Sequence, residues 1–313
     1  MIYPKMLNEK EVIKIISPSN GITKEKKLSD LSNCIKKLNK YGFVVEEDLY
    51  TRKSEKGSSA IGVDRAKELL KNIKENNVNC LLSVSGGDFL IELFDYCNLD
   101  SIKNNVKWIQ GHSDVTNLLY FITTYYDIST IYSFNACAIG SDIEKKQIED
   151  NINFLKGNLI VQELVDNKKF HFDNINLTGR IIGGCLDSLL DIVGTKYDFT
   201  NSFINKYKND GIIWYFDIAD LSNESIYRGL WQLKNAGWFK NTKAILFGKL
   251  KQEISYTKIA FDESIQRALF DLDVIIITNV NIGHIYPRIT IINGSLAHIK
   301  DDNGILKIGF DLK

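Results

Sequence analysis

The stretch CLLSVSGGD, residues 80–88, holds the pattern from which we predict the fold. Residues 80–84 are mostly apolar and predict a buried strand, which stops at the turn 85–88. A helix is expected to follow from about Phe89 to Tyr96. A buried strand that runs through a Gly-Gly turn into a helix is typical of the repeating units of a parallel sheet.

The same order of strand, turn and helix recurs on both sides of this stretch. Apolar runs predict more strands, and apolar residues at helical spacing predict more helices: strands at 12–16, 106–110 and 128–132, helices near 28–38, 66–73 and 115–125. This alternation predicts an α/β fold, a parallel sheet with helices on both faces. Functional loops lie at the carboxyl ends of parallel strands, so the turns 17–21, 85–88 and 111–114 are expected to gather at one edge.

The second half of the chain has a different pattern. A polar stretch, 166–176, is predicted to be a linker between an N-terminal domain over 1–165 and a C-terminal domain over 177–313. In the second half, a strand over 211–216 ends at Asp217, and a later strand leads to a loop that contains His284. Two titratable side chains therefore follow strand ends in one domain.

Composition and charge exclude several classes of protein. The 313 residues include 39 basic and 39 acidic side chains, and this balance argues against a dedicated nucleic-acid binder. No apolar run approaches the roughly 18 residues that span a bilayer, so we expect no membrane association. Charges are scattered through the N-terminal stretch where a signal sequence would be apolar, which predicts a cytoplasmic protein.

Known cofactor and metal motifs are missing from the sequence. The five cysteines are widely spaced, with no Cys/His pair at metal-ligand spacing, so we expect neither a zinc site nor a disulfide framework. The Gly-Gly turn is neither a dinucleotide fingerprint nor a P-loop. No cofactor is therefore expected, and the cysteines are interpreted as buried apolar residues.

Three features are candidates for chemistry. Backbone N–H groups near Gly86, Gly87 and Asp88 could face an anion or an oxyanion, although a tight turn that needs positive φ would also explain the glycines. His284 could be a general base, or simply a surface histidine. Asp217 could orient an imidazole, or cap a strand end. Together these residues would form a divided hydrolase site.

Five landmarks, taken in order, resemble the LD-carboxypeptidase family of serine peptidases, which includes the microcin self-immunity peptidases. They are Ile-Ser-Pro-Ser at 16–19, Ser-Gly-Gly-Asp at 85–88, Gly-His-Ser-Asp-Val-Thr at 111–116, the glycine-rich segments at 177–184 and 194–197, and the segments around Asp217, 227–233 and His284. The match spans nearly the whole chain, and its ordered combination is more specific than any single landmark.

The resemblance implies a Rossmann-like N-terminal domain, a β-rich α/β C-terminal domain and an active site between them. It also implies a Ser-His-Glu triad that cleaves an L,D-peptide bond, as in releasing the terminal D-alanine of a murein tetrapeptide. The substrate would be a small peptide or peptide conjugate. His284 falls on the family histidine, and Asp217 falls on the family glutamate, one methylene shorter.

The sequence departs from the family at the nucleophile. The family serine lies three positions after the second glycine, where this chain has Leu90, and leucine cannot act as a nucleophile. One hypothesis is a relocated nucleophile, with Ser113 as the first candidate and Ser85 and Ser19 as others. Ser113 could instead cap the helix that follows it.

The alternative hypothesis is a catalytically inactive peptide-binding or self-immunity protein of the same fold. We favour a hydrolase, since both Asp217 and His284 are kept at strand ends. The oligomeric state, a homodimer included, stays open.

Overall fold

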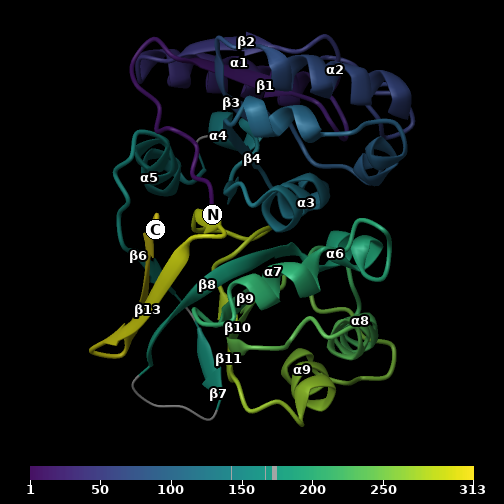
Figure 1. Cartoon of the computed structure of the whole chain (residues 1–313), viewed down its shortest axis with the longest axis vertical. Coiled ribbons are helices and arrows are strands. Elements are labelled where there is room, and N and C mark those ends of the chain that lie inside the picture. Colours follow the sequence, from purple (N-terminus) through teal and green to yellow (C-terminus); the bar gives the residue numbers. More distant parts are fainter. Residues whose placement is uncertain (142, 166, 171–174) are drawn as a thin grey trace. The chain divides into compact units, whose positions relative to one another are not determined.

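The computed structural model covers the chain and describes all residues except 142, 166 and 171–174 (Figure 1). By its internal contacts the chain divides into two compact units. Unit 1 comprises Met1–Leu159 and Thr290–Ile292, and unit 2 comprises Ile160–Ile289 and Asn293–Lys313. The predicted linker, 166–176, lies partly outside the described residues, and its described part contains a short strand, β7 (Lys168–Phe170).

Unit 1 is built on a six-stranded sheet in the order β12-β5-β4-β3-β1-β2. Its strands are β1 (Val12–Ile16), β2 (Val44–Glu47), β3 (Val78–Ser83), β4 (Trp108–Gly111), β5 (Thr130–Tyr132) and β12 (Ile291–Asn293). Strands β1 to β5 pair in parallel, which confirms the prediction made from the strand–helix alternation.

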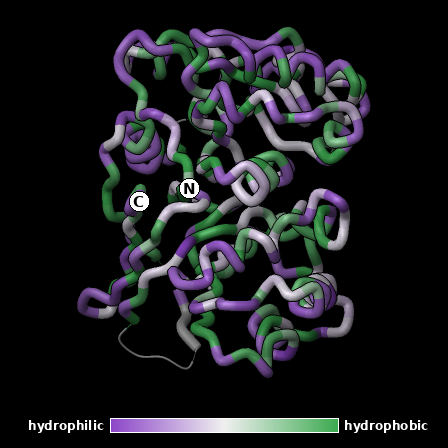
Figure 2. Tube along the Cα trace, viewed as in Figure 1, coloured by the Kyte–Doolittle hydropathy of each residue, from purple (hydrophilic) through white to green (hydrophobic). Residues whose placement is uncertain are grey.

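Helices connect these strands. The α-helices are α1 (Glu25–Lys40), α2 (Gly62–Lys74), α3 (Thr116–Tyr126), α4 (Ala136–Gly140) and α5 (Lys145–Leu155). Helices α1 and α2 bury one face, whereas α3 is buried along almost its whole length. In α1, Leu31, Cys34 and Leu38 are buried at helical spacing, while lysines occupy the outer face. Figure 2 shows hydrophobic and hydrophilic residues alternating along such helices.

Unit 2 is built on an eight-stranded sheet in the order β6-β14-β13-β8-β9-β10-β11-β7. Its strands other than β7 are β6 (Gln162–Leu164), β8 (Asn176–Cys185), β9 (Ile212–Asp217), β10 (Thr242–Gly248), β11 (Ile275–Val280), β13 (Leu296–Asp302) and β14 (Ile305–Asp311). The central strands β8 to β11 are parallel, and the flanking pairs are antiparallel. The predicted α/β architecture, with a parallel-sheet unit and a β-rich unit, is confirmed.

The helices of unit 2 are α6 (Leu186–Ile192), α7 (Thr200–Lys206), α8 (Asn223–Asn235) and α9 (Phe261–Leu269). Ser222 caps α8, because its hydroxyl accepts a hydrogen bond from the Ser225 N–H. Buried aromatic side chains fill the space beside β9, where the rings of Trp214 and Trp238 stack 5.5 Å apart. In the described part of the chain, every helix is too short or too polar to cross a membrane.

Candidate active site

The three predicted turns do meet at the carboxyl edge of the unit 1 sheet. The Ser19 hydroxyl donates to Oδ2 of Asp114 at 2.5 Å, and the Leu90 N–H donates to the same oxygen at 2.9 Å. The Ser85 hydroxyl donates to the Asn20 carbonyl oxygen at 2.8 Å. These bonds join segments up to 95 residues apart and confirm the prediction that the turns gather at one edge.

Arg65 of α2 links the segments at this edge by hydrogen bonds. Its buried guanidinium donates to the backbone carbonyl oxygens of Ala60, Pro18 and Phe89 at 2.8–3.1 Å, and to the Glu92 carboxylate. The planar fork of arginine suits several acceptors at once, so one side chain fixes the turns that flank the Gly-Gly segment.

The two glycines of the turn allow close approach by other segments. A Cβ atom at Gly86 would lie 2.9 Å from Cβ and 3.0 Å from Oγ of Ser113, and one at Gly87 would lie 2.3 Å from Oγ of Ser19. Both glycines lie outside the left-handed region of φ. Crowding by neighbouring serines therefore explains the glycines, and the interpretation as a turn that needs positive φ is wrong.

The segment after the turn differs from the predicted helix. It is a six-residue 3₁₀ helix, η1 (Leu90–Asp95), and the Leu90 side chain is fully buried. Leu90 therefore belongs to the core of unit 1. Among the described residues, no hydrogen-bond acceptor is found for the backbone N–H groups of Gly87 and Asp88, which lie at the surface of the turn.

Ser113 lies in a strained turn between a strand and a helix. Its φ is +65°, which is uncommon for a residue with a side chain, and it begins a short 3₁₀ turn, η3 (Ser113–Val115), that leads into α3. His112 occupies the cap position of η3 and Val115 that of α3, so Ser113 is not at a cap position. Its N–H donates to the Tyr132 hydroxyl at 3.3 Å, and the residue is half-buried.

In unit 2, Asp217 and His284 lie in direct contact. Nδ1 of His284 is 2.8 Å from Oδ2 of Asp217, and the His284 backbone N–H donates to Oδ1 of Asp217 at 3.2 Å. Of the two interpretations of Asp217 that the sequence left open, this contact favours the one in which its carboxylate orients the imidazole. Gly283 makes the contact sterically possible, since a Cβ there would lie 1.8 Å from Oδ1 of Asp217.

The surroundings of this pair favour an imidazole that can gain a proton. Asp217 is fully buried, whereas 24% of the His284 side chain is exposed. Burial acts to lower the pKa of His284, but the charge of Asp217 and its contact with the ring outweigh burial and hold the pKa above 6.5. Asp217 is therefore placed to stabilise an imidazolium, as the acid of a catalytic triad does.

Cys185 adjoins the pair, and sequence reasoning missed it. It ends β8 beside Asp217, which ends the neighbouring strand β9 in register with it. Burial, followed by the charges of Asp217 and Asp187, raises the pKa of its thiol well above the ordinary value. The signal in the sequence was its place directly after two glycines at a strand end.

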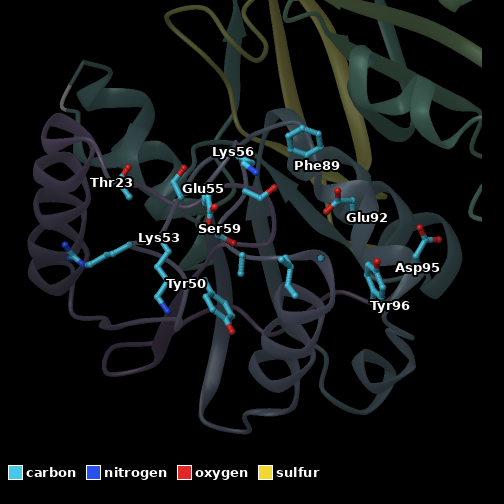
Figure 3. A pocket seen from close by; sticks show the side chains of 16 residues that line it. Thr23, Tyr50, Lys53, Glu55, Lys56, Ser59, Phe89, Glu92, Asp95 and Tyr96 are labelled. Atoms are coloured by element: carbon cyan, nitrogen blue, oxygen red, sulfur yellow. The ribbon is translucent and has the colours of Figure 1, made fainter.

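A cavity of about 940 Å³ opens in unit 1 beside η1 (Figure 3). One wall comes from the loop over 50–62, which carries Lys53, Glu55 and Lys56, and the other from Phe89 and the residues of η1. Phe89, the residue before Leu90 in the chain, forms part of the cavity wall. Local sequence pattern carries no signal for this cavity, because its two walls come from segments far apart in the chain.

Comparison with known proteins identifies the family to which the chain belongs. The profile of the LD-carboxypeptidase N-terminal domain matches residues 13–133, and that of the LD-carboxypeptidase C-terminal domain matches residues 178–299. The chain belongs to the LD-carboxypeptidase family, and so its function is LD-carboxypeptidase-like.

Two relatives align along most of their lengths. A predicted carboxypeptidase of Vibrio cholerae is 26% identical over 98% of both chains. The microcin self-immunity protein MccF of Escherichia coli is 24% identical over 87% of this chain and 85% of its own.

Solved structures share the fold. An MccF-like protein from Bacillus anthracis has a TM-score of 0.83 at 22% identity, with 100% of both chains covered. MccF in complex with aspartyl sulfamoyl adenosine has a TM-score of 0.78 at 19% identity, covering 99% of this chain and 98% of its own. Muramoyltetrapeptide carboxypeptidase from Oxalobacter formigenes has a TM-score of 0.80 at 17% identity, covering 96% and 99%.

Proposed function

We propose that this protein is an active peptide hydrolase of the LD-carboxypeptidase type, with His284 as general base and Asp217 as the residue that orients it. The observation that carries the proposal is the 2.8 Å contact between Nδ1 of His284 and the buried carboxylate of Asp217. When the proton of the neutral ring sits on Nδ1, which faces the Asp217 carboxylate, Nε2 carries no proton and can accept one. Aspartate serves this purpose as well as the family glutamate does.

The proposed nucleophile is the hydroxyl of Ser113. Its positive φ in a strand–turn–helix segment resembles the strained elbows that present nucleophiles in other hydrolases. The hydroxyls of the other two candidates, Ser19 and Ser85, donate to Asp114 and to the Asn20 carbonyl oxygen. We favour Ser113 on its backbone conformation.

The reaction would follow the serine-hydrolase sequence. Oγ of Ser113 is the proposed atom that attacks the carbonyl carbon of the scissile bond, and Nε2 of His284 is the proposed acceptor of the proton that the attack releases. The imidazolium then protonates the departing amine as the C–N bond breaks, and water hydrolyses the acyl-enzyme. The N–H groups of Gly87 and Asp88 are the proposed donors to the oxyanion, because no protein acceptor for them is found among the described residues.

The structural neighbours suggest two substrate classes. One neighbour is named for muramoyltetrapeptide cleavage, and another was solved with an aminoacyl sulfamoyl nucleoside. We propose that a small peptide with an L,D-bond at its carboxyl end is the substrate, which would place the protein in the recycling of peptidoglycan fragments in the cytoplasm. A peptide–nucleotide conjugate is the second class to assay.

The test is release of D-alanine from a murein tetrapeptide, measured with D-amino-acid oxidase. We expect Ser113→Ala and His284→Ala each to lower kcat by about 10³-fold or more, because each removes a member of one catalytic unit. Ser85→Ala is the matched control and should keep wild-type activity, since its hydroxyl is engaged with a backbone carbonyl.

Other outcomes would overturn parts of the proposal. Full activity in Ser113→Ala together with loss in His284→Ala would mean that another group is the nucleophile. An inactive wild type that gains activity in Leu90→Ser, and loses it again on adding His284→Ala, would mean that hydrolysis was lost at the Gly-Gly turn. A wild type that binds the tetrapeptide without cleaving it, with Leu90→Ser equally inert, would support the binding-protein hypothesis.

A further inference from the structure

Unit 2 brings together three side chains that commonly bind metals, two from the ends of β8 and β9 and one from the loop after β11. One ligand atom each from Cys185, Asp217 and His284 lies within 4.8 Å of the other two. Asp187, at the start of α6, lies beside this cluster, because its Oδ2 is 3.5 Å from the Cys185 sulfur. All four residues belong to unit 2.

The three ligand atoms lie within 4.8 Å of one another, so the ligands of a tetrahedral metal ion would have to draw closer together around it. With Zn–S bonds of about 2.3 Å and Zn–O or Zn–N bonds of about 2.0–2.2 Å, neighbouring ligand atoms are roughly 3.3–3.6 Å apart. The 3.5 Å between Cys185 and Asp187 falls in this range. The 2.8 Å between Asp217 and His284 is shorter, and a small rotation of the exposed imidazole would widen it.

The surroundings already orient the carboxylates as outer-shell partners do in metal sites. Asp187 accepts hydrogen bonds from the backbone N–H groups of Ala219 and Asp220 at 3.1 and 3.0 Å. Asp217 accepts one from the backbone N–H of His284. The partly exposed ring of His284 provides an entry path from solvent.

The charges of the cluster also favour a cation. The carboxylate of Asp217 and the thiol of Cys185 are both buried beside His284, and once the thiol is deprotonated a divalent ion would balance their two negative charges. The ligand set is mixed, with one sulfur, one imidazole nitrogen and carboxylate oxygens. Such a set suits Zn²⁺ and disfavours Mg²⁺ and Ca²⁺, which prefer oxygen ligands alone.

We propose that Cys185, Asp217 and His284, with Asp187 beside them, form a binding site for a thiophilic divalent metal ion such as Zn²⁺, and that its occupation switches off the general base. The second part rests on the proposed function. The thiol gives up one proton to solvent when the ion binds, since a coordinating thiol is deprotonated. Nδ1 of His284, which faces Asp217, becomes the metal ligand.

The inhibition follows from the tautomers of imidazole. When a metal occupies Nδ1, the single proton of the neutral ring must sit on Nε2. Nε2 then cannot accept a proton from a nucleophile. Asp217 also stops orienting the ring, because its carboxylate now binds the ion. One ion would thereby remove both the base and its partner.

The first experiment needs no enzymatic activity. Metal-free full-length protein is titrated with Co²⁺ and followed by absorption spectroscopy, and Zn²⁺ is then added as competitor against a chromophoric chelator. We expect one Co²⁺ per chain, with tetrahedral d–d bands in the visible and a thiolate-to-metal charge-transfer band in the near ultraviolet. Cys185→Ser should abolish the charge-transfer band and weaken Zn²⁺ binding by about 10-fold or more.

Controls separate this site from general thiol binding. Cys34→Ser changes another buried free cysteine, in α1, and should leave both bands unchanged. Asp187→Asn keeps the thiol and should weaken Zn²⁺ binding while retaining the charge-transfer band. The absence of Co²⁺ binding in the wild type would overturn the proposal, and so would a charge-transfer band that survives in Cys185→Ser. The wild-type titration tests the proposal even if a variant fails to fold.

The second experiment tests the regulatory part. D-alanine release is measured with and without Zn²⁺, and each protein is compared with its own metal-free rate. We expect Zn²⁺ to inhibit the wild type and a chelator to restore it, with Cys185→Ser needing about 10-fold more Zn²⁺ for the same inhibition. Equal inhibition of both proteins would overturn the regulatory part. A wild type that is inactive without metal would count against the proposed function and leave the Co²⁺ result standing.

Discussion

Replacing Gly283 by alanine tests whether the position of the Asp217 carboxylate matters for catalysis. Gly283 has a φ of +87°, and its missing Cβ leaves the space that the carboxylate fills. A Cβ would lie 1.8 Å from Oδ1 and 2.3 Å from Oδ2 of Asp217. Because ordinary Cβ contacts start at 3.4 Å, Oδ1 would have to retreat by about 1.6 Å.

Two energetic costs add at this position. An L-residue in the left-handed region costs about 1–2 kcal/mol. Forcing extra volume into a packed site adds about 1–3 kcal/mol. We therefore expect Gly283→Ala to lower the free energy of unfolding of unit 2 by about 2–5 kcal/mol. Since a misplacement of about 1 Å at a catalytic group can cost about 10²-fold in rate, we expect kcat to fall by at least that factor.

Gly304→Ala is a matched control, because Gly304 has a φ of +85° and its added Cβ would meet nothing within 4 Å. Gly304→Ala should lower the free energy of unfolding only by the cost of the left-handed backbone conformation, about 1–2 kcal/mol, and should keep full activity. Stability is measured by urea denaturation followed by tryptophan fluorescence, and activity by D-alanine release. If both variants lose equal stability and Gly283→Ala stays fully active, the reasoning about the carboxylate is refuted.

Three further predictions concern other parts of the molecule. Gly86→Ala should lower kcat by about 10²-fold, because its Cβ would lie 2.9 Å from the Ser113 Cβ and displace the hydroxyl, as D-alanine release would show. Arg65→Met should lower the free energy of unfolding of unit 1 by about 3–5 kcal/mol in urea denaturation, since buried backbone carbonyls and a carboxylate lose their donor. Glu224 accepts hydrogen bonds from residues 255–257, and although desolvation acts to raise its pKa, these bonds outweigh desolvation and lower it from 4.5. The ionised carboxylate therefore anchors the loop over 255–257 fully above pH 4.5, and this anchoring is lost progressively as the pH falls below 4.5. Acid should accordingly increase proteolysis of the loop in the wild type. In Glu224→Gln, proteolysis of the loop should be increased at all pH values.

Each of these predictions has its own control or contrary result. Gly309→Ala, whose Cβ would make only an ordinary 3.4 Å contact, should stay active, and full activity in Gly86→Ala would count against Ser113 as nucleophile. Arg52→Met removes an exposed ion pair and should cost less than about 1 kcal/mol, so an equal loss in Arg65→Met would disprove the role of Arg65. A loop in Glu224→Gln that still responds to acid as the wild type does would show that another group controls it.

Much of unit 1 could be predicted from the sequence, because the relevant signal is local. Apolar runs and helical spacing follow from which face of each element is buried, and parallel strands place their carboxyl ends at one edge. For this reason the meeting of the turns at 17–21, 85–88 and 111–114 was predictable. The contact of Asp217 with His284 was predictable on the same ground, since both follow strand ends in one domain.

Other features depend on contacts between distant residues, and local pattern carries no information about them. Only packing decides that the side chain of Leu90 is buried and that its backbone N–H donates to Asp114. The positive φ of Ser113 is likewise imposed by its surroundings.

The strand order of unit 2 shows the limit most clearly. Residue spacing indicated no metal site, because Cys185, Asp217 and His284 are far apart in the chain. Pairing of β8 with β9 sets Cys185 beside Asp217, and the loop after β11 brings His284 to them. The sequence alone determined which elements form and which residues end them. The tertiary structure decided which of those ends are neighbours, because strand order is fixed by the packing of the whole sheet.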